Sequence, residues 1–114
     1  MWREMPVEGD QWTLTQGDRL CGVITVHEVD QPWVSGRWTP TAEFALWAGL
    51  FERDLALVRA DSWDEVGVAD FEEVQAAIRQ ALQLRYPDGR TVPEFLLHVD
   101  GSTAWFRWNA EPDD

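Results

Sequence analysis

Alternating apolar and polar positions near the N-terminus predict a β-hairpin. Apolar residues alternate with threonines over residues 12–15, Gly17-Asp18 marks a turn, and residues 19–29 are rich in Val, Ile and Thr. A two-residue loop at Gly17-Asp18 would place Leu14 opposite Cys21. Because residues 19–29 carry apolar side chains on both faces, we expect this strand to be central and covered.

A second hairpin is expected near the C-terminus, after a further strand over residues 33–38. Apolar positions alternate over residues 95–99 and lead into Asp100-Gly101, a favoured pair for a tight turn. With that loop, Glu94 lies opposite Arg107. Partners of opposite charge support this register, because like charges placed directly opposite each other are destabilising.

Two central segments have the periodicity of amphipathic helices. Thr39-Pro40 predicts an N-cap and first helical residue, and the helix is expected to end near Arg59. Residues 60–69 are expected to form a loop. Asp70, with a glutamate three residues later, predicts the start of a second helix that ends near Leu84. The two apolar stripes comprise Phe44, Trp47, Phe51, Leu55 and Val58 in the first helix, and Phe71, Val74, Ile78 and Leu82 in the second.

The order of strands, two helices and strands predicts an α+β fold. We expect a single antiparallel sheet, made of two N-terminal hairpin strands, a third strand and a C-terminal hairpin, packed on one face by two helices. The 114 residues suit one domain. Residues 1–10 are expected to form a loose lead-in and residues 109–114 an acidic tail.

Composition narrows the possible partners. The 21 acidic and nine basic residues give a net charge of −12, and every basic residue is arginine. Such a chain repels phosphate backbones and anionic membrane surfaces, so we expect neither nucleic acid nor membrane as a partner. A basic protein or a cationic ligand is favoured. One cysteine cannot form an internal disulfide, and no apolar stretch has the length of a signal peptide or membrane span, which leads us to expect a soluble, cytoplasmic protein.

No motif in the chain identifies a reaction, a cofactor or a metal. One cysteine and two histidines are too few for a Cys/His zinc site, and no acidic spacing fits a calcium loop. Cys21 and His27 share one face of a predicted strand but lie about 20 Å apart along it, too far for a catalytic dyad. Cys21 is therefore expected in the core, and an enzymatic function is not favoured.

Our first hypothesis is a small binding protein that docks or inhibits a basic protein. It depends on an acidic stretch that contains one tryptophan and no base, consisting of Asp61, Trp63, Asp64, Glu65, Asp70, Glu72 and Glu73. Immunity proteins and antitoxins have a similar composition, which is an analogy of composition only. A solvated loop and helix start, where acids suit the positive end of the helix dipole, is the competing interpretation.

The alternative hypothesis is a small-ligand-binding protein or small enzyme. A chain this short cannot fully bury eight tryptophans, so some of them could line a pocket between the sheet and the first helix. The candidate residues are Trp33, Trp38, Glu94, His98, Trp105 and Arg107.

A second apolar ridge on the first helix leaves another possibility open. It consists of Leu46, Leu50 and Leu57, which either pack against another internal element or form the contact of a homodimer.

Overall fold

Six antiparallel strands form one curled sheet in the computed structural model, which describes residues 6–30, 32–60 and 65–109. The strands are β1 (Gln11–Gln16), β2 (Arg19–Asp30), β3 (Trp33–Pro40), β4 (Gln83–Arg85), β5 (Glu94–Asp100) and β6 (Thr103–Asn109). Their order across the sheet is β4-β1-β2-β3-β6-β5. Residues 1–5 of the expected lead-in, Gln31, residues 61–64 of the expected 60–69 loop and residues 110–114 of the expected tail lie outside the described residues.

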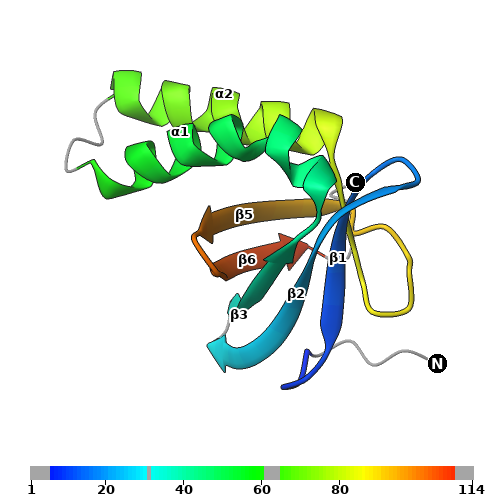
Figure 1. The fold of residues 1–114 in the computed structure, drawn as a ribbon. Helices are drawn as coiled ribbons and strands as arrows, with labels where there is room; N and C mark the ends of the chain where they lie inside the picture. The colour runs from blue at the N-terminus through cyan, green and yellow to red at the C-terminus, as the bar shows by residue number, and fades with distance from the viewer. Residues whose placement is uncertain (1–5, 31, 61–64, 110–114) are drawn as a thin grey trace.

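Two helices pack on one face of this sheet, close to β5 (Figure 1). They are α1 (Ala48–Arg59), preceded by the short 3-10 helix η1 (Ala42–Leu46), and α2 (Glu65–Ala81). The prediction of an α+β fold with one antiparallel sheet and two helices is therefore confirmed. The three-residue strand β4 was not predicted, because it is too short to show an alternating pattern. In the part of the chain that the structure describes, no helix is both long and apolar enough to cross a membrane.

The first hairpin turns at Gly17-Asp18 as predicted, but its register differs. Gly17 has a φ of 59°, and Gln16 pairs with Arg19 on either side of the turn. A β-bulge between Leu14 and Thr15 then shifts the pairing by one residue, so that Leu14 lies opposite Gly22 and not Cys21. A bulge adds one residue to one strand, and alternation alone does not reveal it.

The C-terminal hairpin turns one residue later than predicted. Asp100 pairs with Thr103, so the loop is Gly101-Ser102, with Gly101 at a φ of 61°. A glycine of positive φ at the first loop position is typical of a type II′ hairpin turn. As a result Glu94 lies opposite Asn109, and the predicted pairing of Glu94 with Arg107 is wrong.

Both predicted helix starts are also corrected. Pro40 ends β3, and the N-cap is Thr41, whose hydroxyl accepts a hydrogen bond from the Glu43 amide at 3.3 Å. The first helical segment ends at Arg59 as predicted. The second helix begins five residues before Asp70, so Asp70 is an internal residue, and it ends at Ala81 because β4 follows at once.

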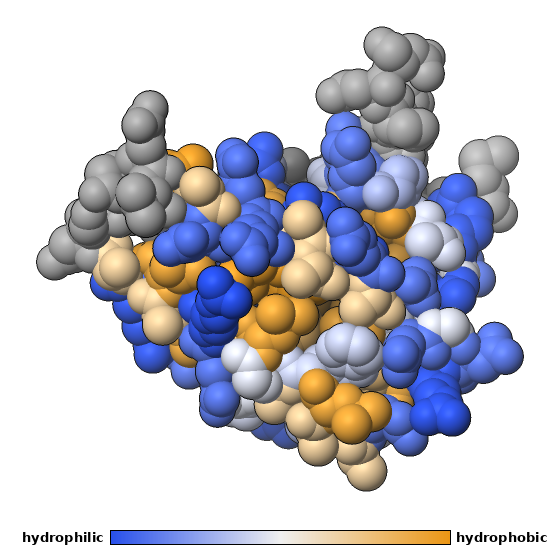
Figure 2. Space-filling view, turned by 90° about the horizontal axis from the view of Figure 1, so that it is seen from above, coloured by the Kyte–Doolittle hydropathy of each residue, from blue (hydrophilic) through white to orange (hydrophobic). Residues whose placement is uncertain are grey.

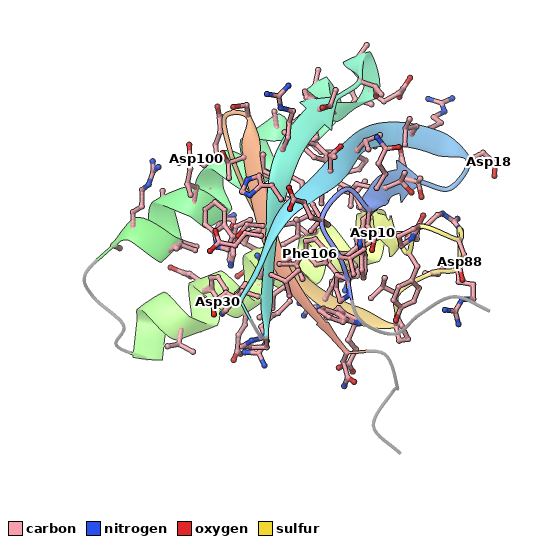
Figure 3. The ribbon with its side chains drawn as sticks, turned by 90° about the horizontal axis from the view of Figure 1, so that it is seen from below. Asp10, Asp18, Asp30, Asp88, Asp100 and Phe106 are labelled. Carbon is pink, nitrogen blue, oxygen red and sulfur yellow. The ribbon has the colours of Figure 1, made fainter. Side chains whose placement is uncertain are left out.

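The core lies between the sheet and the helices. Trp12 is fully buried, with its ring centroid 4.8 Å from that of Phe106 and 5.1 Å from that of Tyr86. Phe106 is labelled near the middle of the molecule in Figure 3. Phe51 of α1 and Ile78 of α2 are buried on the helix side, as their apolar stripes predicted. Burial of these large apolar side chains stabilises the fold.

Both outer strands of the sheet are covered. On β5, the carbonyl oxygens of Phe95 and Leu97 accept hydrogen bonds from side chains of α2. On β4, Arg85 forms a β-bridge with Thr91, and the amide of the next residue, Val92, donates to the Leu84 carbonyl at 2.8 Å. Part of the backbone at each edge is thus hydrogen-bonded within the chain itself.

The substitution Gly22→Ala should destabilise the protein. A Cβ at residue 22 would lie 2.2 Å from the Trp38 ring, which is itself buried against Phe44. We expect the free energy of unfolding to fall by about 1–3 kcal/mol, as for overpacking in other cores. Urea denaturation followed by circular dichroism measures this loss. Gly49→Ala on α1 is the control, because a Cβ added there meets no atom within 4 Å, and a loss as large in that variant would contradict the steric explanation.

Candidate functional site

Three polar side chains are buried where the helices meet strand β5. Asp54 of α1, Gln75 of α2 and His98 of β5 have exposed fractions of 0%, 1% and 4%. Buried polar groups are costly unless they are hydrogen-bonded, so these three residues require partners. They find most of those partners in one another, whereas Gln75 Oε1 has no hydrogen-bond partner among the described residues.

The Asp54 carboxylate is the centre of this network. His98 Nδ1 donates to Asp54 Oδ2 at 2.7 Å, and Gln75 Nε2 donates to Asp54 Oδ1 at 2.6 Å. Gln75 Nε2 also lies 3.3 Å from the Leu97 carbonyl oxygen. Because a carboxylate can only accept hydrogen bonds, His98 carries its hydrogen on Nδ1, and Nε2 holds the lone pair when the ring is neutral.

Aromatic rings surround the His98 imidazole. The centroids of Trp105, Trp33 and Phe71 lie 5.2, 5.8 and 6.0 Å from that of His98. Among the described residues, none forms a hydrogen bond with His98 Nε2. The imidazole is oriented as a general base would be, but it is almost completely covered. Its hydrogen bond to Asp54 joins α1 to β5, and Gln75 of α2 shares the same carboxylate.

An open groove of about 640 Å³ lies beside this network. Its walls come from the start of β5, the end of β6 and the last turn of α2. The lining residues are Arg79, Glu94, Phe95, Leu96, Arg107, Trp108 and Asn109. Leu96 precedes His98 by two residues on the same strand face, so the groove and the covered histidine are neighbours.

Charges of both signs line the groove. The Arg107 guanidinium carbon lies 5.8 Å from the Trp33 ring centroid, within range of a cation-π contact. Arg79 donates from a terminal guanidinium nitrogen (Nη1) to the Phe95 carbonyl at 3.5 Å. Glu94 accepts a hydrogen bond from the Asn109 amide at 3.4 Å. The two guanidinium groups and one carboxylate leave one net positive charge in the groove.

The structure places five of the six sequence-predicted ligand residues on one side of the sheet. Strand pairing puts Trp33, Glu94, His98, Trp105 and Arg107 on the same face. The sixth, Trp38, lies on the opposite face and is buried, with its ring 5.0 Å from that of Phe44. The sequence had led us to expect a pocket between the sheet and the first helix. The groove lies instead against α2.

Sequence reasoning missed Asp54 and Gln75, although a signal was present. Asp54 falls three residues after Phe51, and Gln75 falls three residues before Ile78. Both positions are therefore on the apolar stripes of their helices. A polar residue inside such a stripe indicates a buried partner, and this criterion would have selected both.

The acidic stretch is described only in part. Asp61, Trp63 and Asp64 lie outside the described residues. Glu65 begins α2, Asp70 is half-buried, and Glu72 and Glu73 are exposed on the same helix. Figure 3 shows other carboxylates, at Asp10, Asp18, Asp30, Asp88 and Asp100, at turns on several sides of the molecule. Docking of a basic protein through the acidic stretch stays a prediction.

The leucine ridge divides into an internal and an exposed part. Leu50 and Leu57 are half-buried and pack against the core, whereas Leu46 is 69% exposed. Hydrophobic residues form a band across the helix side of the molecule, flanked by hydrophilic ones (Figure 2). A homodimer contact at this ridge stays a prediction.

Cys21 is not available as a nucleophile. Its side chain is fully buried, and burial together with the charge of Glu43 raises the pKa of the thiol. The thiolate is the reactive form of cysteine, so both effects suppress reactivity. The sequence-based expectation of a core cysteine agrees with this burial.

Comparisons with known proteins give no relative. No family model matches the chain, and searches of curated proteins and of solved structures found no match.

The substitution Asp54→Ala should destabilise the protein strongly. It leaves His98 and Gln75 buried without their common acceptor, and breaking a buried polar network of this kind costs about 3 kcal/mol. Urea denaturation measures the change. Glu52→Ala is the matched control, since it removes an exposed carboxylate from the same helix and should change stability by less than about 0.5 kcal/mol. Equal effects of the two substitutions would show that the network contributes little.

The Cys21 thiol should resist modification in the folded protein. Because it is buried and its pKa is raised, 5,5′-dithiobis(2-nitrobenzoate) at pH 8 should react slowly with native protein and rapidly after unfolding in guanidinium chloride. The absorbance of the released thionitrobenzoate follows the reaction. Equal rates in the two states would contradict the burial of Cys21.

Proposed function

We propose that the protein binds a small organic ligand in the groove between strands β5 and β6 and helix α2. The observation that carries this proposal is the groove itself, whose volume of about 640 Å³ falls within the range of small-molecule sites. Its lining combines three apolar residues with four charged or amide residues, and these polar groups can orient a bound ligand.

Hydrogen bonds between α2 and β5 fix the positions of two walls of the groove. Gln75 and Arg79 lie one helical turn apart on α2, and both donate hydrogen bonds to backbone carbonyls of β5. These bonds hold the helix against the strand, so the spacing of the walls is set before any ligand arrives. Preorganisation of this kind reduces the entropy lost on binding.

The groove supports ligand binding better than the surroundings of His98 do. His98 is only 4% exposed, so a ligand would first have to displace the rings around it. The groove is open to solvent and needs no such rearrangement. The histidine network then serves as the rigid base of the site and makes no contact with the ligand.

Substitution Leu96→Trp should abolish ligand binding. A larger side chain at residue 96 fills the groove, because Leu96 forms part of its lining. A fragment library of neutral, cationic and anionic compounds is screened against ¹⁵N-labelled protein by NMR. We expect bound fragments to shift amide signals of residues 94–96 and 107–109, and Leu96→Trp to remove these shifts.

Leu20→Trp is the control for this screen. Leu20 also lies in a strand and is partly exposed, but it is not part of the groove lining. Binding should persist in this variant. A library in which no fragment shifts the groove signals, or shifts that survive Leu96→Trp, would reject the proposed function.

A further inference from the structure

We infer that the ligand of this groove is an organic monocarboxylate, that is, one carboxylate group joined to an apolar body. This inference rests on the proposed function and specifies its ligand class. It depends on two arginines, one glutamate and the apolar part of the lining.

The positive charge of the groove is unusual for this protein. The chain has a net charge of −12 and only nine basic residues, yet Arg79 and Arg107 both line one groove. The two residues come from different elements, α2 and β6, and their convergence is a product of the fold. A guanidinium group recognises a carboxylate through paired hydrogen bonds, so two of them in one lining favour an anionic ligand.

Both guanidinium groups are held in place but keep donors free. Arg107 is positioned by the face of the Trp33 ring, a contact that uses none of its N–H groups. Arg79 uses one terminal nitrogen for the Phe95 carbonyl. In the described part of the chain neither arginine forms an ion pair, whereas Arg19, Arg59 and Arg90 each pair with a carboxylate. Arg79 and Arg107 therefore remain able to bind an added anion.

The rest of the lining restricts the anion to a single charge. Glu94 lies in the same groove, held by Asn109, and would repel a second negative charge on the ligand. The net charge of −12 on the whole protein likewise repels a dianion, such as a phosphate monoester, more strongly than a monoanion. Leu96, on the same sheet face as Glu94 and Arg107, supplies apolar surface for the uncharged body of the ligand.

The test compares 3-phenylpropionate with its neutral analogue 3-phenylpropanamide. The two compounds share the same body, so any difference in affinity reports on the carboxylate. We expect 3-phenylpropionate to shift the Nε–H signals of Arg79 and Arg107 in ¹H–¹⁵N spectra and to bind at least about tenfold more tightly than the amide, as expected for charge-assisted hydrogen bonds.

Variants that remove one positive charge test which arginines bind the carboxylate. Arg79→Gln and Arg107→Gln should each weaken binding of 3-phenylpropionate by about tenfold and leave binding of the amide unchanged. Arg53→Gln is the control, because Arg53 is an exposed arginine on α1 that is not part of the groove lining. It should bind both compounds as the unmodified protein does.

The outcomes separate this inference from the proposed function. Equal affinity for acid and amide, or insensitivity of acid binding to both arginine substitutions, overturns the carboxylate inference and leaves ligand binding in the groove intact. Absence of binding by either compound also overturns the carboxylate inference. The proposed function is overturned if no fragment of the mixed library shifts the groove signals, or if the shifts survive Leu96→Trp.

Discussion

The hydrogen bonds of the Asp54 carboxylate hold the two layers of this fold together. One carboxylate accepts from a histidine of the edge strand β5 and from a glutamine of α2, while its own backbone belongs to α1. Taking these groups out of water is costly, and the cost is offset only while every partner stays in place. The network therefore ties α1, α2 and β5 together at one buried point.

The groove depends on that arrangement because its two sides belong to different layers. Arg79 comes from the helix layer, whereas Glu94 and Arg107 come from the sheet. A small rotation of α2 would move Arg79 away from its carbonyl acceptor on β5 and change the spacing between the two guanidinium groups. Ligand binding in the groove and stability of the fold therefore both depend on the position of α2. Arg79 of this helix lines the groove, whereas Gln75 belongs to the buried network.

Much of the architecture was accessible from the sequence, because alternation and helical periodicity report directly on which face is buried. Register was not accessible, since the bulge beside Leu14 and the turn at Gly101 each displace the pairing without altering the pattern. The candidate site was partly accessible. Strand alternation correctly placed Glu94 and Arg107 on one face, but Arg79 reaches them only through the packing of α2, which no local pattern encodes.

The covering of both outer strands has a consequence for how copies of this chain can meet. An uncovered strand is a template onto which another chain adds its own strand, which is the first step of many fibrils. Here the segment around Thr91 and Val92 occupies one side, and donors from α2 occupy carbonyls on the other. Backbone pairing with another chain at these groups would first have to break those bonds, which disfavours that route to aggregation.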